Sequence, residues 1–273
     1  MEYEIKPTGR LSINLKELWE YKELFYFFTW RDVKVKYKQT ALGLVWAVLQ
    51  PAAMMVVFTF VFGRIINEQT ATRLPYPVFV YIGLMLWGIF SGGLQAAGNS
   101  MVSNSNIIKK IYFPRLIIPM SSILVSVFDF LMTLIPFVGL LIYYHIPVDI
   151  VRLIWVFPMA LFLILTSTFG AGLFLAALNV KYRDFRYVLP FLIQFLMFVT
   201  PVIYPMQILD NKWLMLLLKM NPIGNAISLF RSAFDGSAVD LNWLLISFII
   251  TSLMLVFGVF YFRKTESYFA DLI

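Results

Sequence analysis

Few residues of this chain have types and positions that could do chemistry. It has one histidine, His145, and no cysteine, so it lacks the side chains for a thiolate nucleophile, a disulfide or a histidine or cysteine metal site. Asp129 lies in the middle of a long apolar stretch, and no Lys, Arg or His lies in another such stretch to pair with it. A carboxylate there is either a proton relay or a structural group that is protonated or hydrogen-bonded to Ser or Thr. His145, at the end of the same stretch, is typical of an interface residue. We therefore predict no catalytic, cofactor or metal site in this chain.

Glycines recur at spacing five between positions 83 and 98, but none is followed by Lys and then Ser or Thr. They do not form a nucleotide-binding loop, which also needs a place between a strand and a helix. The pairs Gly88 and Gly92, and Gly172 and Ala176, instead have the spacing of small residues where membrane helices approach closely. They point weakly to self-association.

The composition excludes an ordinary soluble domain. Of the 273 residues, 60% are hydrophobic and 14% are charged, against about 45 to 50% and about 25% in soluble proteins. The mean hydropathy is +0.80. Too few polar side chains remain to cover a surface that faces water, so we expect an integral membrane protein. The net charge of +7 then concerns topology, and we expect no nucleic acid partner.

Six stretches are apolar enough to cross a bilayer. A run of 22 helical residues reaches about 33 Å, against about 30 Å of hydrocarbon. The third stretch contains Pro119 and Pro136 and must tilt, kink or project, and the fifth is short and carries Pro190 and Pro201. The six are Leu42 to Gly63, Val78 to Gly98, Leu116 to Tyr144, Leu153 to Leu178, Val188 to Pro205 and Leu244 to Phe262.

The cations set the orientation of these spans. Sixteen Lys and Arg residues fall on one side and six on the other, and positive loops stay in the cytoplasm. We therefore expect both termini inside, no cleavable signal peptide, and three parts: a cytoplasmic region at 1–41, a six-span domain at 42–262 with an outer segment at 206–242, and a cytoplasmic tail at 263–273.

The segment Leu11 to Tyr37 has apolar residues at helical spacing among many charges. This pattern predicts an interfacial amphipathic helix on the inner membrane surface, with its cations toward lipid phosphates. A solvated cytoplasmic helix is the alternative, which the nearly unbroken apolar run Leu24 to Trp30 disfavours.

The inner loop from Asn99 to Arg115 predicts a short helix outside the membrane. Ser103 or Asn104 could cap it and Pro114 would end it. Exposed isoleucines beside cations favour a docking surface over a plain anchor loop, which would explain only the cations. The predicted surface consists of Asn104, Ile107, Ile108, Lys109, Lys110 and Ile111.

Two further apolar segments, Asn211 to Met220 and Ile223 to Phe234, are too short to span a bilayer. At about 15 to 18 Å they fit two re-entrant or interfacial outer helices. A helical hairpin on the outer surface is the alternative.

Five sequence features together resemble a known family. They are the interfacial helix, NSNIIKKIYFPR in the first inner loop, NVKYRDFRY in the second, TPVIYP at the end of the fifth span, and NPIGNAISLFRSAFDG before the sixth. In order and spacing, over Leu11 to Lys264, the chain resembles the permease subunits of polysaccharide ABC exporters. That family includes the O-antigen transporter subunit Wzm and the permeases for teichoic acid and capsule export.

The resemblance implies an all-α, six-span subunit of the bacterial inner membrane that works as a homodimer. Two cytoplasmic ABC ATPase subunits would bind ATP and Mg, so this chain needs no cofactor of its own. Asn104 to Ile111 would be the main coupling helix, and Tyr182 to Arg186 would lie near the cytoplasmic side. Spans one, two and five of both copies would enclose a channel, through which ATP hydrolysis drives lipid-linked polysaccharide outward.

Aromatic residues make up 18% of the chain, and aromatic faces suit sugar C–H groups. Most are expected to face lipid. Those on or beside the implied channel spans are predicted to contribute to the sugar pathway: Tyr37, Trp46, Tyr81, Trp87 and Tyr204.

Two other functions remain open. An ion-coupled secondary carrier would use Asp129 as its ion site. A membrane-embedded glycan transferase would need grouped acids, whereas the outer acids are scattered among loops: Glu68, Asp149, Asp210, Asp235 and Asp240. The sequence does not identify the polymer, its length, or any carbohydrate-recognition domain on the ATPase.

Overall fold

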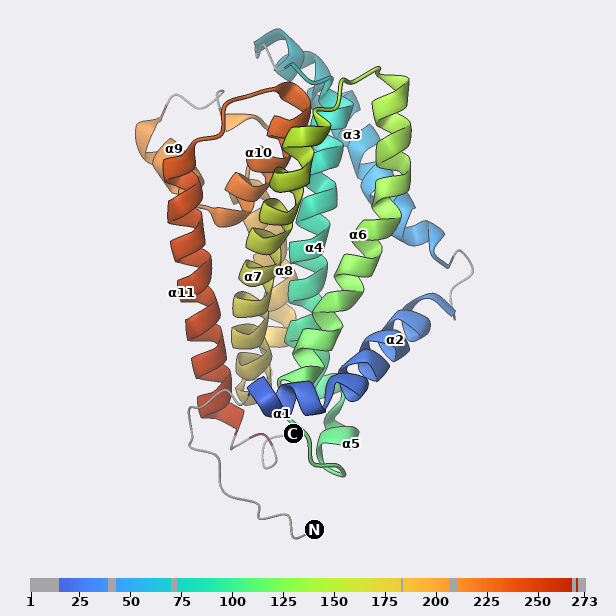
Figure 1. The fold of residues 1–273 in the computed structure, drawn as a ribbon, viewed down its shortest axis with the longest axis vertical. Coiled ribbons are helices and arrows are strands. Elements are labelled where there is room, and N and C mark those ends of the chain that lie inside the picture. Colours follow the sequence, from blue (N-terminus) through green and yellow to red (C-terminus); the bar gives the residue numbers. More distant parts are fainter. Residues whose placement is uncertain are drawn as a thin grey trace.

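The computed structural model describes residues 15–38, 43–69, 73–182, 184–206, 211–266 and 269, and within these ranges its regular secondary structure consists of helices. Five helices are long and apolar enough to span a membrane, or up to six spans if α9 and α10 count as one broken span. Figure 1 shows them as one bundle. In chain order the helices are α1 (Leu15–Glu20), α2 (Lys22–Lys38), α3 (Val45–Gln69), α4 (Tyr76–Ser103), α5 (Ser105–Ile108), α6 (Ile117–Tyr143), α7 (Ile150–Lys181), α8 (Phe185–Val199), α9 (Lys212–Lys219), α10 (Pro222–Asp235) and α11 (Leu241–Glu266).

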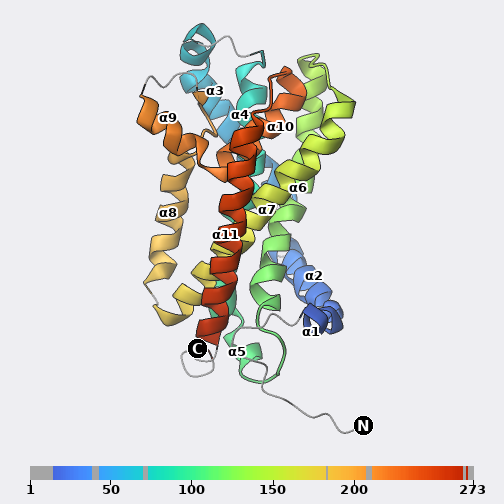
Figure 2. The same ribbon diagram turned by 60° about the vertical axis from the view of Figure 1, so that its left-hand side comes forward.

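Helix α8 differs from the predicted fifth span. It has 15 residues, about 22 Å of helix, which is less than the roughly 30 Å of a hydrocarbon core. It ends at Val199 because Thr200 is extended (φ −101°, ψ 136°), the conformation that a following proline, here Pro201, imposes. Figure 2 shows α8 to one side of the bundle, with α9 above it.

Helix α4 is the centre of the bundle, packed between α6 and α7 (Figures 1 and 2). Nearly all of its side chains from Tyr76 to Phe90 are buried. Buried Ser and Thr on α6 and α7 donate to carbonyls of their own helices, as Ser126 does to Ile123 at 2.7 Å and Thr168 to Ile164 at 2.7 Å. These bonds satisfy polar groups inside an otherwise apolar core.

Helices α7 and α11 meet where each has a glycine. A Cβ on Gly170 would lie 2.6 Å from the carbonyl carbon of Met254, and one on Gly258 would overlap the carbonyl oxygen of Gly170. The predicted pair at Gly172 also packs inside the subunit, since a Cβ there would lie 2.9 Å from the Cβ of Ala97. These small residues therefore serve packing within one copy.

We expect Gly258→Ala to destabilise the subunit by about 1 to 3 kcal/mol, because the added methyl group forces α7 and α11 apart. Gly139→Ala is the matched control, since a Cβ at Gly139 meets no atom within 4 Å. The melting temperatures of both variants in detergent test this. Equal temperatures would mean that the two helices do not approach as described.

The two ends of the bundle carry different elements. Helices α1 and α5 and the end of α11 lie at one end, while α9, α10 and the start of α11 lie at the other (Figure 1). Helix α2 crosses the bundle obliquely beside α6. Both described chain ends therefore lie on the α5 side.

Candidate functional site

Helix α5 is shorter than predicted and is not capped as predicted. It ends at Ile108, and the side chain of Asn104 makes no cap hydrogen bond to it. Asn104 Nδ2 instead donates to the carbonyl of Ser100 at 2.8 Å, and Asn104 Oδ1 accepts from Arg31 Nη2 at 2.7 Å. The amide of Asn104 therefore links α4 to α2, which explains why it does not cap α5.

The side chains of the predicted docking surface do not all face outward. Ile108 is 8% exposed and packs in a small core with Phe28 of α2, and Asn104 is also buried. Lys109 and Lys110 are exposed, and Ile111 is 62% exposed. Tyr112, which the predicted surface did not include, is 77% exposed and extends this surface.

Helix α2 is attached to this loop by two contacts. Arg31, which also pairs with Asp32 of its own helix at 2.6 Å, donates to Asn104. The ring of Phe28 lies 5.7 Å from that of Phe113 near the end of the loop. A movement of the loop would therefore move α2.

The other end of α2 is tied to Asp129 in the middle of α6. Lys36 Nζ lies 2.5 Å from Asp129 Oδ2, and the hydroxyl of Tyr37 donates to Asp129 Oδ1. Burial, followed by the hydrogen bond to the Asp129 carboxylate, raises the pKa of Tyr37 above its usual value. Asp129 thus has a Lys and a Tyr as partners and not the Ser or Thr that the sequence suggested. The sequence analysis did not find this cation because Lys36 lies outside the apolar stretches.

The five predicted pathway aromatics are not gathered in one place. Tyr81 is fully buried and donates to the carbonyl of Thr133 at 3.0 Å, and Trp87 is 5% exposed. These two side chains lie in the core of the subunit. Trp46 is 52% exposed on α3, and Tyr204 donates to the carbonyl of Phe198 at 2.9 Å.

At the opposite end of the bundle a buried cation holds the chain between α8 and α9. Arg231 of α10 is 4% exposed. Its guanidinium donates to the carbonyls of Phe79 at 2.9 Å, Pro201 at 3.0 Å and Val202 at 2.6 Å, and it lies 3.4 Å from the centre of the Phe79 ring. No carboxylate pairs with it among the described residues. Backbone oxygens therefore supply the compensation that a buried charge needs.

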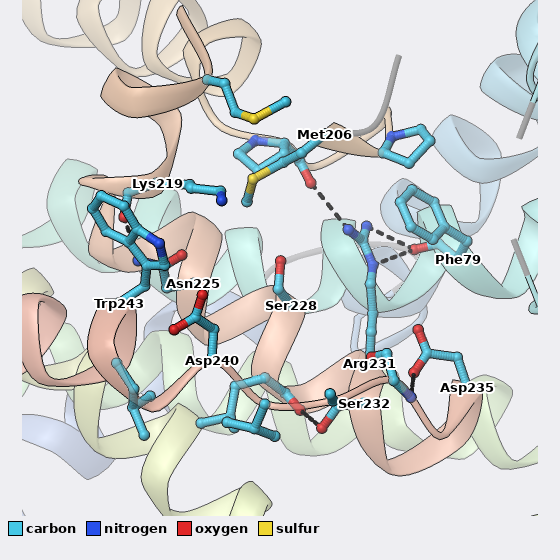
Figure 3. A pocket seen from close by; sticks show the side chains of 18 residues that line it. Phe79, Met206, Lys219, Asn225, Ser228, Arg231, Ser232, Asp235, Asp240 and Trp243 are labelled. Carbon is cyan, nitrogen blue, oxygen red and sulfur yellow. Dashed lines mark hydrogen bonds between the residues drawn. The ribbon is translucent and has the colours of Figure 1, made fainter. Parts of the chain in front are cut away.

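A cavity of about 400 Å³ lies next to this cation, between α9, α10 and the start of α11. Figure 3 shows Arg231 at one side of it and Trp243 with Lys219 at the other. Polar and aromatic side chains from three helices therefore converge at the end of the bundle opposite α5.

Residues 23–234 match the family model described as ABC-2 type transporter. The chain belongs to this family. The match spans α2, the α5 loop, Asp129 and Arg231, so these features lie inside the ABC-2 type region, while Trp243 lies beyond it.

Proteins of known role are similar over most of this ABC-2 type chain. The O-antigen export system permease protein RfbA of Klebsiella pneumoniae is 26% identical over 264 residues, covering 97% of this chain and 99% of its own. The protein of that name from Myxococcus xanthus is 27% identical over 222 residues, 81% and 83% of the two chains. The polysialic acid transport protein KpsM of Escherichia coli is 24% identical over 252 residues, 86% and 91%.

Proposed function

We propose that this chain is the membrane subunit of an ATP-driven exporter of polysaccharide. The observation that carries the proposal is the end-to-end similarity to permease proteins named for O-antigen export, 97% of this chain and 99% of that relative. Deleting the gene should remove the polymer from the cell surface and leave it inside, attached to its lipid carrier, and the intact gene should restore it. Normal surface polymer in the deletion strain would contradict the proposal.

The docking site for the ATPase is the exposed part of the α5 loop. Ile111 and Tyr112 offer apolar area outside the bundle, flanked by the exposed cations Lys109 and Lys110. Exposed apolar side chains on a short structured loop are typical of a protein interface. In this proposal one ATPase subunit, which itself binds ATP and Mg, docks there on each copy of the chain and pushes on the loop. The bond from Arg31 to Asn104 passes the movement to α2.

A second copy of the chain completes the path for the polymer. None of the side chains in the most apolar part of α3 is buried within the subunit, and Phe191 and Phe195 of α8 are exposed as well. We propose that α3 and α8 of two copies face each other around the channel. Among the predicted aromatics, Trp46 has the exposure that contact with a sugar chain requires, so it is the first choice for the pathway.

The α5 end is proposed to face the cytoplasm of a bacterial inner membrane, because sixteen of the 22 Lys and Arg fall on that side of the sequence. Helix α1 and the first part of α2 would lie in the membrane interface, while the end of α2 reaches the middle of α6. Trp19 and Trp30 are exposed on them, with Lys22 at 5.2 Å and Lys34 at 5.3 Å from the respective rings. Amphipathic aromatics and cations together suit lipid headgroups. Helices α9 and α10, bent by 81°, would form the outer re-entrant pair.

We expect Asp129→Asn to keep ATP-dependent export, since the amide oxygen can still accept from Tyr37 while only the ion pair with Lys36 is lost. Lys36→Met removes the same pair from its other side. The two variants should therefore have equal effects, and the double variant no more than either. Export measured as surface polymer in cells that carry each variant tests this.

The same pair of variants examines the ion-coupled alternative. A secondary carrier that uses Asp129 would lose all transport in Asp129→Asn and keep it in Lys36→Met, because only the first removes the titrating group. That pattern would replace the ATP-driven proposal.

A further inference from the structure

The cavity beside Arg231 has the size and lining of a small-ligand site. Its volume of about 400 Å³ falls in the range of about 300 to 1,000 Å³ that such sites have. It is lined by α9, α10, the connection between α10 and α11, the first turn of α11, part of the segment 201–206, and Phe79 of α4. In Figure 3 the hydroxyl of Ser228 points into the space between Trp243 on one side and Arg231 on the other, with Met206 above it.

One wall combines an aromatic ring with fixed polar groups. Lys219 Nζ lies 5.6 Å from the centre of the Trp243 ring, an arrangement that orients the indole. Asn225 Nδ2 donates to the carbonyl of Lys219 at 2.6 Å and to Ser247 Oγ at 2.7 Å, so both of its donor hydrogens are engaged and its amide oxygen is left as an acceptor. An aromatic face with fixed hydrogen-bonding groups beside it suits a sugar ring.

Asp240 adds a carboxylate at the same wall. Its Oδ1 accepts from the backbone N–H of Asn242 at 3.2 Å, at the start of α11, and a carboxylate has a second oxygen that can accept hydroxyl donors. The bond to Asn242 fixes the direction of the group. Charged acceptors held in place make strong and directional hydrogen bonds to hydroxyls.

The charges of the cavity balance. Lys219 and Arg231 bring two positive charges and Asp235 and Asp240 two negative ones. The guanidinium of Arg231 already donates to three carbonyls, so it is engaged within the protein. A site with no net charge and several hydrogen-bonding groups favours a neutral, hydroxyl-rich ligand over a phosphate or a lipid tail.

We propose that this cavity binds one or two neutral sugar units of the exported polymer at the outer end of the subunit, with Trp243 as the stacking surface and Asp240 as the hydroxyl acceptor. The inference rests on the proposed function for the identity of the polymer. It assigns a sugar contact to the α10–α11 corner, where none of the five predicted pathway aromatics lines the cavity.

The test uses the intact transporter, purified with any subunits that accompany it, in nanodiscs. The probe is a set of oligosaccharides of one to six units, released by mild acid from the cell's own surface polysaccharide. Binding is measured by native mass spectrometry and by saturation-transfer NMR.

Trp243→Ala should weaken oligosaccharide binding about tenfold, since the stacking surface is lost, and Trp243→Phe should restore most of it. Asp240→Asn should weaken binding about fivefold and still cap α11, because Asn is as good an N-cap as Asp. The matched controls are Trp213→Ala and Asp149→Asn, which change an exposed Trp of α9 and another capping Asp outside the cavity. Both should bind as the unmodified protein does.

Equal binding in Trp243→Ala, Asp240→Asn and the controls would overturn the proposal. Binding of phosphatidylglycerol in the cavity, with no oligosaccharide bound, would also overturn the proposal and assign the site to lipid. Neither result touches the proposed function, whose failure shows separately as normal surface polymer when the gene is deleted.

Discussion

Replacing Arg231 by Met is expected to destabilise the folded subunit by about 2 to 5 kcal/mol, because at least two buried carbonyls lose their donor at once. Pro201 and Val202 lie in the non-helical segment between α8 and α9, and Arg231 bonds to both of their carbonyl oxygens. The segment should lose its fixed course, and α10 its contact with α4. The fraction of monodisperse protein and its melting temperature in detergent measure the effect.

Two further variants serve as comparisons for Arg231→Met. Arg231→Lys keeps the charge but not the planar, forked donor set, so it should recover only part of the stability. Arg152→Met removes a partly exposed arginine at the same end of the bundle that also donates to a carbonyl, that of Ser237, and should leave the melting temperature unchanged. Full recovery in Arg231→Lys would show that charge alone, and not the directed bonds to three carbonyls, stabilises this end.

Ile111→Asp is expected to abolish the coupling of ATP hydrolysis to export while the subunit still folds. The side chain is 62% exposed, so the subunit tolerates a charge there, but an apolar interface does not. Loss of one central apolar contact weakens an interface by about 2 kcal/mol or more, roughly thirtyfold in affinity. The measurement is the ATPase activity of the complex in nanodiscs, with the amount of bound ATPase determined in parallel.

The control for this variant is the same change at the other end of the bundle. Ile150 is 68% exposed at the start of α7, so Ile150→Asp should leave coupling intact. Ile108→Asp is a second comparison. Because Ile108 is buried, this variant should fail to fold, whereas Ile111→Asp should fold and fail to couple. Normal coupling in Ile111→Asp would remove the α5 loop from the docking surface.

Much of the helical architecture followed from apolar length alone. The predicted spans Val78 to Gly98 and Leu244 to Phe262 lie inside α4 and α11, because a long uninterrupted apolar run in lipid must satisfy its own backbone by forming helix. The fifth stretch was harder, since Pro201 ends α8 early and the remaining apolar residues continue as a non-helical segment. The end of this helix is therefore set by the proline and could not be predicted from hydropathy.

The features that sequence reasoning missed depend on partners that apolar patterns do not reveal. The cation for Asp129 is Lys36, which belongs to a segment predicted to lie in the interface and not in a span. Arg231 was counted only as an outer cation, because its partners are backbone carbonyls, which every residue has. Tyr81 was predicted to lie on the pathway because the family resemblance places its span beside the channel, but neither the resemblance nor hydropathy shows which side of α4 faces the core, where Tyr81 is buried.

Purifying this chain with a tag, in mild detergent from its native cell, tests the central claim most directly. The proposal predicts a stoichiometric companion identified by mass spectrometry as an ATPase, at one copy per permease, and Ile111→Asp should lose it while Ile150→Asp keeps it. Reproducible absence of any such companion, with the chain alone transporting polymer in vesicles, would contradict the ATP-driven exporter and return attention to Asp129.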